Sequence, residues 1–521
     1  MQDLAIKLSM LLVFFAVMVG IGLYCRRHAT DVSGFVLGGR SVGPWLTAFA
    51  YGTSYFSAVV FVGYAGQFGW KYGIAATWAG LGNAFLGSLL AWAVLGRRTR
   101  VMTQHLDSAT MPEFFGKRFG SRSLKLAASV IIFIFLIPYT ASLYNGLSRL
   151  FGMAFDIDYS VCVVVMAVLT GVYVIAGGYM ATAINDFVQG IIMIVGIIAV
   201  IAAVLHSHGG FMAALEGLAQ VSDPSVSDAP GVFASFFGPD PAGLLGVVLL
   251  TSLGTWGLPQ MVQKFYAIKS EKSINTGMVI STVFAVIVSG GCYFLGGFGR
   301  LYSGQVNVAA EGYDAIIPTM LSDLSTMLIA IVVILVLSAS MSTLSSLVLA
   351  SSSTLTLDFI KDNLIKDMDE KRQVRWMRAL VVVFIAISVV LAIIQYQSNV
   401  TFIAQLMGIS WGALAGAFLA PFLYSLYWKR TTKAACAASF LFSTVVMLCN
   451  IFFADFFPTL LQSSINCGAF CMLAGLVIVP VVSVLTRAPE QSRLQEIFSC
   501  YDRTVTVTVK DSIGRGGERL K

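Results

Sequence analysis

The sequence has few charged residues. Asp, Glu, Lys and Arg make up 11% of its 521 residues, whereas 57% are hydrophobic and the mean hydropathy is +0.83. This composition excludes an ordinary soluble globular domain, in which about 25% of residues are charged. The chain is therefore predicted to be an all-α polytopic membrane protein.

Stretches long and apolar enough to cross roughly 30 Å of hydrocarbon as helices recur along the chain. The first has no small-residue cleavage site before its basic flank, so we interpret it as a retained helix and not as a signal peptide. We expect 13 transmembrane helices, near residues 5–25, 44–70, 73–96, 124–149, 158–177, 183–205, 242–266, 274–299, 317–356, 378–396, 400–427, 434–453 and 465–486.

Histidine and cysteine are also scarce. All four histidines fall in predicted loops or at span ends, which argues against a buried imidazole proton relay. The eight cysteines lie mostly within spans and the loop 206–243 has none, so no disulfide framework is indicated. Because no nucleophile with a base, metal-ligand cluster or phosphate-binding loop is recognisable at membrane depth, the sequence predicts neither an enzyme nor an organic cofactor.

Basic residues are nearly missing from one side of the predicted membrane. If the N-terminus is outside, the inside loops and the C-terminal tail hold all but four of the 33 Lys and Arg residues, including Lys264, Lys269 and Lys272 of one loop. This asymmetry predicts that the N-terminus is outside and the C-terminus is cytoplasmic. The asymmetry also accounts for the net charge of +7, because the basic residues lie next to the lipid bilayer, which is the expected partner. No nucleic-acid partner is expected. The four exceptions are Lys7, Lys71, Arg149 and Arg300.

Two predicted spans are interrupted near their middle. The second span has polar or flexible residues from Gly52 to Ser57, and the seventh contains Gly254, Gly257 and Pro259. Both spans are expected to unwind there. Five spans separate their starting points, which is the spacing of an inverted repeat whose halves each open with a discontinuous helix. The alternative is that Gly and Pro only kink packed helices.

One apolar span carries a stripe of hydroxyl groups within the sequence SASMSTLSSLVLASSST of residues 338–354. At about 100° per residue, the stripe occupies one arc of the helix, and leucines lie on the other side. A stripe of oxygens that faces away from lipid could bind a polyatomic solute or a dehydrated cation. Its members are Ser338, Ala339, Ser342, Thr343, Ser345 and Ser346.

Several sequence blocks resemble one family of carriers. In chain order they read GGRSVGPWLTA, TMPEFFGKRFG, GGYMATAINDFVQG, LPQMVQKFYAIKS and ASMSTLSS. On these blocks the chain resembles, nearly end to end, the sodium:solute symporter family of proline, sugar, pantothenate, sialic acid and monocarboxylate carriers. The resemblance implies a five-plus-five inverted repeat of the leucine-transporter type and symport of a small organic solute with sodium.

The resemblance also implies how the chain is organised. Residues 1–30 would form an extra N-terminal helix, 44–205 the first repeat, 242–427 the second repeat, 434–486 two C-terminal helices and 487–521 a cytoplasmic tail. We expect an integral protein of a bacterial cytoplasmic membrane. The sequence gives no indication of oligomeric state.

A sodium site is implied by the family pattern. The matching oxygens here are the backbone carbonyls of Thr53, Phe56 and Ala339 and the hydroxyls of Ser342 and Thr343. The last three stand at i, i+3 and i+4, hence on one helix face. Five neutral oxygens also suit a monovalent ion better than a divalent one, which calls for carboxylates.

Some members of the family hold a second sodium. The matching residues are Asp186 with Ser342, Ser345 and Ser346, although Asn185 stands where a threonine is usual. A competing interpretation is that Asp186 caps its helix or pairs with an inside Lys or Arg.

Polar uncharged and aromatic side chains near the interrupted spans are candidates for the solute site. Such a set suits a small zwitterion, carboxylate or polyol, and we prefer a carboxylate or amino acid to a sugar, to be met by hydroxyls and amides because no basic residue is expected at mid-depth. Proline is disfavoured, since proline carriers of the family have an aspartate where Tyr55 stands and aromatic residues where Thr251 and Thr255 stand. Each candidate could instead serve packing or interhelical hydrogen bonding. The candidates are Tyr55, Ser57, Gln67, Asn83, Tyr139, Tyr144, Thr255, Trp256, Gln260, Gln405 and Trp411.

Two alternatives to a sodium-coupled carrier remain at this point. One is a transporter-like solute sensor, which would need a separate signalling partner because the tail from Arg487 is too short for a kinase domain. The other is a proton-coupled carrier of the same fold, in which Asp186 carries the proton.

Overall fold

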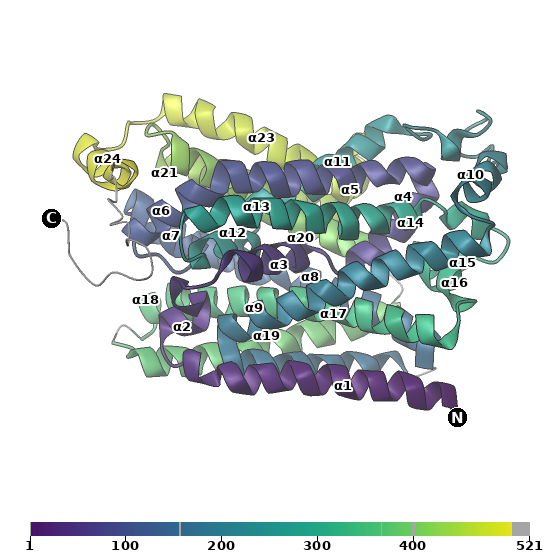
Figure 1. Ribbon diagram of the computed structural model, residues 1–521. Coiled ribbons are helices and arrows are strands. Elements are labelled where there is room, and N and C mark those ends of the chain that lie inside the picture. Colours follow the sequence, from purple (N-terminus) through teal and green to yellow (C-terminus); the bar gives the residue numbers. More distant parts are fainter. Residues whose placement is uncertain (1, 156–157, 366, 399–402, 503–521) are drawn as a thin grey trace, which may run out of the picture.

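The protein is a bundle of helices that lie roughly side by side (Figure 1). The computed structural model describes residues 2–155, 158–365, 367–398 and 403–502, so part of the expected tail and the first residues of the span 400–427 lie outside the described residues. Within these ranges the chain is helical, with two isolated β-bridges. The helices are α1 Gln2–Cys25, α2 Val32–Leu37, α3 Pro44–Tyr55, α4 Ala65–Tyr72, α5 Thr77–Gly82, α6 Arg97–His105, α7 Met111–Phe119, α8 Arg122–Phe155, α9 Tyr159–Ser207, α10 Phe211–Gln220, α11 Pro241–Gly257, α12 Pro259–Ala267, α13 Lys272–Ala285, α14 Gly291–Gly296, α15 Val308–Glu311, α16 Ile316–Ser322, α17 Thr326–Thr354, α18 Lys361–Asn363, α19 Glu370–Ser398, α20 Ile403–Tyr427, α21 Lys433–Phe453, α22 Thr459–Gln462, α23 Ser464–Leu485 and α24 Gln491–Phe498.

Both predicted interruptions are confirmed. Helix α3 ends at Tyr55, and Phe56 is extended (φ −86°, ψ 115°) before a π-helical segment, Val59–Tyr64, leads into α4. Helices α11 and α12 are separated by Leu258 (φ −77°, ψ 124°) and enclose a bend of 46°. The first break lies at Phe56, within the predicted segment from Gly52 to Ser57. Pro259 takes the first position of α12, where its missing N–H is tolerated.

The expected number of 13 spans is not confirmed. Ten helices in the described ranges are long and apolar enough to cross a membrane, or up to 11 if the bent pair α11 and α12 is one span. The run Tyr159–Ser207 covers two of the expected spans, and the run Val59–His105 covers the span 73–96 and the second part of the span 44–70. Gly73 (φ 62°, ψ −144°) and Gly178 (φ 55°, ψ −148°) interrupt them with backbone angles that residues with a Cβ rarely adopt.

The basic segments gather at one end of the bundle. Helices α6, α7 and α18 lie there with α24, whereas α1 begins at the opposite end (Figure 1). The described part of the chain runs from α1 at one end to α24 at the other and therefore crosses the bundle an odd number of times. The expectation that Lys264 lies in an inside loop was wrong, because it is part of α12 and is only 2% exposed.

The block GGRSVGPW forms the connection from α2 into α3 at this basic end. Gly38, Gly39 and Arg40 all have φ between 54° and 65°, which turns the chain tightly after α2. The Arg40 guanidinium then donates hydrogen bonds to the carbonyls of Tyr266, Thr103 and Ser108 at 3.1, 3.3 and 2.7 Å. Val42 pairs in parallel with Ile268 as a β-bridge. The start of one interrupted helix is thereby tied to the end of the other.

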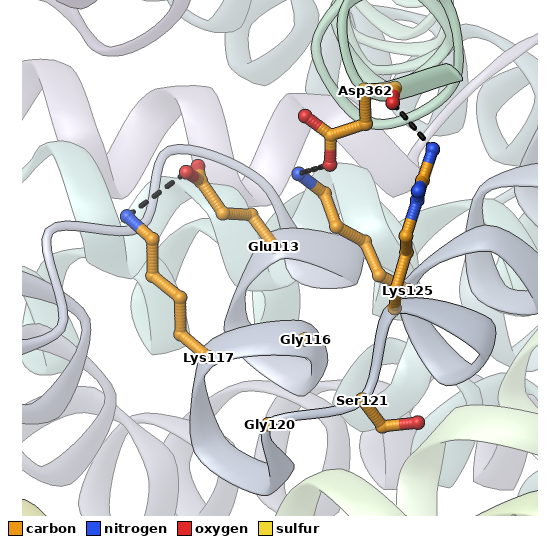
Figure 2. A pocket seen from close by; sticks show the side chains of 8 residues that line it. Glu113, Gly116, Lys117, Gly120, Ser121, Lys125 and Asp362 are labelled. Atoms are coloured by element: carbon orange, nitrogen blue, oxygen red, sulfur yellow. Dashed lines mark hydrogen bonds and ion pairs between the residues drawn. The ribbon is translucent and has the colours of Figure 1, made fainter.

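A pocket of about 320 Å³ lies at the same end (Figure 2). Its charges are paired within the protein: Lys117 Nζ lies 3.0 Å from Glu113, and Lys125 Nζ lies 2.7 Å from Asp362. Arg122 donates to the Asp362 carbonyl at 2.5 Å. Since these cations already have acceptors, we interpret the pocket as part of the packing of α7 and α8 against α18.

Candidate functional site

The hydroxyl-rich segment of α17 lies entirely inside the bundle. Every residue from Ser338 to Thr354 is buried, on the leucine side as well as on the hydroxyl side. Helix α17 packs against α3, α8, α9, α12 and α19, so lipid does not reach this part of it. The hydroxyls must therefore find partners within the protein.

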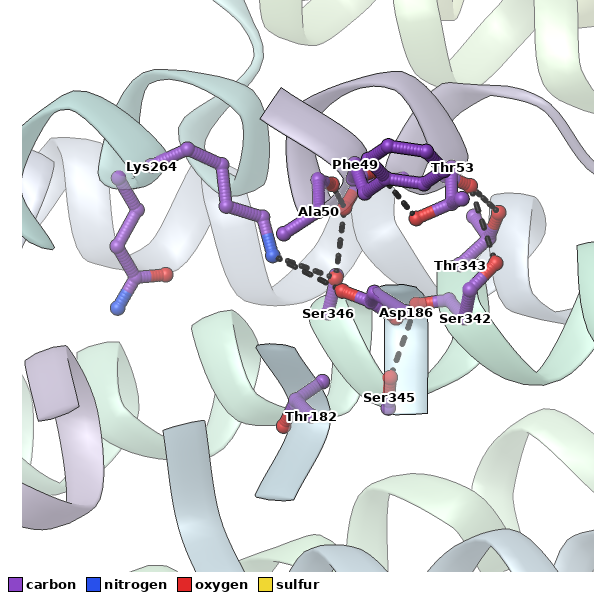
Figure 3. Close-up of polar contacts among 12 residues, drawn as sticks. Phe49, Ala50, Thr53, Thr182, Asp186, Lys264, Ser342, Thr343, Ser345 and Ser346 are labelled. Atoms are coloured by element: carbon purple, nitrogen blue, oxygen red, sulfur yellow. Dashed lines mark hydrogen bonds and ion pairs between the residues drawn. The ribbon is translucent and has the colours of Figure 1, made fainter. Parts of the chain in front are cut away.

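Five oxygens converge where α17 meets the break after α3, and Figure 3 shows three of the residues that supply them, Thr53, Ser342 and Thr343. Thr343 Oγ1 lies 3.1 Å from the Thr53 carbonyl, 3.3 Å from that of Phe56 and 3.1 Å from that of Ala339. Ser342 Oγ lies 3.1 Å from the Thr53 carbonyl and 3.0 Å from that of Ala339. These are the five residues that the family pattern implies for a sodium site.

The local fold explains why these oxygens are available. The extended conformation of Phe56 ends the helical hydrogen-bond ladder, so carbonyls of the last turn of α3 lose their usual N–H partners. Two oxygens that coordinate one hard cation at about 2.3–2.6 Å in perpendicular directions are separated by about 3.3–3.7 Å. The observed spacings of 3.0–3.3 Å are close to this range. A small outward shift would let a monovalent cation replace the hydroxyl-to-carbonyl hydrogen bonds.

A second polar cluster adjoins the first. Asp186 on α9 and Lys264 on α12 form a buried ion pair, with Oδ2 and Nζ 3.7 Å apart (Figure 3). This separation is too long for a hydrogen bond. Lys264 Nζ donates instead to Ser346 Oγ at 3.0 Å, and Ser346 Oγ lies 2.9 Å from Ser54 Oγ. Of the residues matched to a second sodium, Asp186 and Ser346 thus meet around Lys264, whereas Ser345 Oγ bonds the Ser342 carbonyl at 2.9 Å.

No role for Lys264 was predicted from the sequence. It stands in the block LPQMVQKFYAIKS, five residues after Pro259, where it was counted with the basic residues of a loop. The signal that could have found it is a single lysine within the apolar continuation of an interrupted helix. An ionisable residue at such a place is a functional candidate by default. Its pairing with Asp186 agrees with the interpretation that this carboxylate meets a Lys or Arg.

Several solute candidates are engaged in holding helices together. Asn83 Nδ2 donates to Ser289 Oγ at 3.0 Å, and Asn83 Oδ1 accepts from Ser252 Oγ at 3.3 Å. Thr255 Oγ1 donates to the Gly87 carbonyl at 2.8 Å, and Trp256 Nε1 donates to the Leu86 carbonyl at 2.9 Å. The contacts of Ser252, Thr255 and Trp256 join α11 to the helical segment 83–90, and the contact of Ser289 joins the segment 286–290 to it. They favour the interhelical interpretation of these candidates.

Other candidates keep polar atoms unpaired. In the described part of the chain, no hydrogen-bond partner is found for Gln67 Oε1, the hydroxyls of Tyr139 and Tyr144, both amide atoms of Gln260 or Trp411 Nε1, and all five side chains are buried. The rings of Tyr139 and Trp411 meet edge to face with centroids 5.9 Å apart. Buried polar atoms without partners are costly unless a ligand or water satisfies them.

The remaining candidates are not part of this unpaired set. Ser57 is buried at the first break, and its hydroxyl accepts from the Val59 N–H at 3.2 Å. Gln405 is exposed, unlike the buried candidates, and its role in a solute site stays a prediction. Tyr55 is the last residue of α3, and its side chain lies outside the described part of the structure.

A cleft of about 490 Å³ opens at the end of the bundle opposite the basic loops. It is lined by aromatic and charged residues, among them Phe68, Tyr72, Lys71 and Arg300. Two of the four basic residues expected outside therefore border this cleft. Arg300 is held there by Asp223 at 2.6 Å and by the Trp70 carbonyl at 2.7 Å.

Known proteins resemble this chain over most of its length. It is 29% identical to the osmoregulated proline transporter OpuE of Bacillus subtilis (strain 168) over 486 residues, which cover 92% of this chain and 95% of that protein. It is 28% identical to the sodium/proline symporter of Staphylococcus aureus (strain JH9) over 499 residues, which cover 92% and 93%.

A solved structure shows the same fold. A Na⁺-coupled sialic acid symporter, in a substrate-bound outward-open state, superposes with a TM-score of 0.72 at 16% identity and covers 93% of this chain and 99% of that one. The profile of the sodium:solute symporter family matches residues 35–442. These proteins are transporters and not enzymes. The chain is thus an integral membrane protein and belongs to the sodium:solute symporter family.

Proposed function

We propose that the protein is a secondary active symporter that couples the inward movement of sodium to the uptake of a small organic solute by alternating access. The observation that carries this proposal is the group of five oxygens at Thr53, Phe56, Ala339, Ser342 and Thr343. These oxygens come from two helices of different halves of the chain, so an ion bound there would hold the halves together. Release of the ion would let the two helices separate.

The proposal includes the transmembrane arrangement. The breaks at Gly73 and Gly178 would divide the two longest runs and give thirteen spans, with α1 before and α21 and α23 after a five-plus-five inverted repeat of 44–205 and 242–427. The basic loops would face the cytoplasm of a bacterial cell. The cleft beside Lys71 and Arg300 would then face outside. This orientation can be checked by labelling single cysteines introduced at Lys71 and at Lys269 with an impermeant maleimide in intact cells.

For the solute we propose a small carboxylate or amino acid. The unpaired O–H and N–H groups of Tyr139, Trp411 and Gln260 are donors that suit a carboxylate. The two bacterial relatives are named for proline, but this chain has Thr251 and Thr255 where proline carriers have aromatic residues, and both hydroxyls bond backbone carbonyls. Proline belongs in the test panel without being the expected solute.

The test is uptake into proteoliposomes loaded with purified protein. A panel of amino acids and short carboxylates is offered with an inward sodium gradient, and again with choline replacing sodium at the same ionic strength. We expect at least one solute to accumulate only with sodium. Accumulation that follows a pH gradient and ignores sodium would contradict the proposal and favour proton coupling.

A further inference from the structure

The candidate second ion site already contains a positive charge that belongs to the chain. Lys264 Nζ donates to Ser346 Oγ at 3.0 Å and lies 3.7 Å from Asp186 Oδ2 (Figure 3). It also lies 5.1 Å from the centroid of the Tyr179 ring. The ammonium thus contacts a carboxylate, a hydroxyl and an aromatic face at once. All three are groups that attract cations.

The two charges balance each other inside the bundle. Asp186 is fully buried and Lys264 is 2% exposed, and a buried charge is tolerated only when it is paired. In the described residues, neither carboxylate oxygen of Asp186 has a hydrogen-bond partner. Its counter-charge therefore comes from Lys264, and neutrality at this place requires no ion from solution.

A free sodium ion would compete with the ammonium for the same ligands. The family pattern offers Asp186 and Ser346 as ligands of a second sodium, and these are the residues that Lys264 contacts. A cation that coordinates both would stand next to Nζ, where two positive charges repel each other strongly in a buried environment. We propose that the Lys264 ammonium takes the place of a second sodium, so that the carrier binds and couples one sodium ion.

This inference rests on the proposed function and fixes its stoichiometry. Because Lys264 is covalently attached to α12, its charge is never released to the cytoplasm and contributes no driving force from the sodium gradient. Only the ion at Thr53, Phe56, Ala339, Ser342 and Thr343 is carried. One sodium ion per solute gives a shallower dependence of uptake on sodium concentration than two.

The experiment counts bound ions on the full-length protein. Equilibrium binding of ²²Na⁺ to purified protein in detergent, without solute, gives the number of ions per chain. We expect one ion for the wild type and two for Lys264→Gln, which leaves Asp186 as a free carboxylate beside Ser346. Lys264→Arg keeps the tethered cation, and Lys269→Gln removes an exposed lysine five residues away, so both controls should bind one ion.

The outcomes separate this inference from the proposed function. Two ions bound to the wild type, or one ion bound to a folded Lys264→Gln variant, would overturn the inference and leave sodium symport intact. Absence of any sodium binding to the wild type would refute both. If Lys264→Gln does not fold, the charge-matched double variant Asp186→Asn with Lys264→Met is the second test. We expect it to bind one ion, and loss of that ion would show that Asp186 is a sodium ligand after all.

Discussion

The hydroxyl of Thr343 is the most connected oxygen of the proposed sodium site, and its removal should weaken sodium binding without dismantling the helix. Thr343→Val keeps the branched shape and deletes the oxygen that touches the carbonyls of Thr53, Phe56 and Ala339. Thr343→Ser is the matched control, because it keeps the hydroxyl and loses only a methyl group.

The expected magnitude follows from the contact that is lost. A polar interaction with a charged partner is worth about 1.5–3 kcal/mol, and about 1.4 kcal/mol corresponds to a tenfold change in affinity. Thr343→Val should therefore raise the sodium concentration for half-maximal stabilisation about 10- to 150-fold. Thr343→Ser should stay within a few fold of the wild type.

Thermal unfolding in mixtures of sodium and choline chloride at constant ionic strength measures this without knowledge of the solute, because a ligand that binds only the folded state raises its stability. Sodium-dependent uptake, once a solute is found, should shift in parallel. If Thr343→Val folds and responds to sodium like the wild type, the assignment of the five oxygens to sodium is refuted.

Three further predictions concern stability. Gly73→Ala should prevent folding, because φ at this residue is +62° and an added Cβ would lie 2.0 Å from a backbone carbonyl oxygen. Gly20→Ala is the control, because a Cβ at position 20 meets nothing within 4 Å. In size-exclusion chromatography the control should behave like the wild type. Asp186→Asn or Lys264→Met alone should each destabilise by about 3–5 kcal/mol by leaving a buried unpaired charge, and the double variant should regain much of this in thermal unfolding; additive losses would show that the two residues are not coupled. Hydrogen bonds from Ser225 and the Arg300 guanidinium hold the pKa of Asp223 below its usual value. Their stabilising effect is present above the unfolded-state pKa of about 3.9 and is lost as the pH falls through the lower folded-state pKa. Asp223→Asn should therefore make the melting temperature depend less on pH in this acid range. A melting temperature that falls with pH as steeply as in the wild type would contradict the assignment.

The sequence was informative about features that depend on neighbouring residues. The breaks were visible as Gly and Pro within apolar runs, and the shared face of Ala339, Ser342 and Thr343 follows from their spacing. The first break lies at Phe56, within the predicted segment from Gly52 to Ser57, although the sequence did not single out this residue within the segment.

Features that depend on packing between distant helices were not predictable in this way. From the sequence, Lys264 is indistinguishable from a basic residue at the inner end of a span. It is buried beside Asp186 only because α3, α9, α12 and α17 pack together. Packing between distant helices also decides which solute candidates have hydrogen-bond partners and which do not. Asn83, Thr255 and Trp256 have the same chemistry as Gln260 and Trp411, and only the positions of partner carbonyls separate the two groups.

Three of the five oxygens at the break of α3 belong to the main chain. The carbonyls of Thr53 and Phe56 are freed because α3 stops there, and the carbonyl of Ala339 lies within α17, so none of the three depends on the side chain at its own position. Relatives can therefore vary at these three positions and keep every proposed ligand, whereas a substitution elsewhere that lets α3 continue by one turn would remove two of the proposed ligands while leaving all five residues unchanged. A comparison of residue identities detects only the two side-chain ligands of the proposed ion site, Ser342 and Thr343, and the other three oxygens have to be sought in the backbone conformation of each relative.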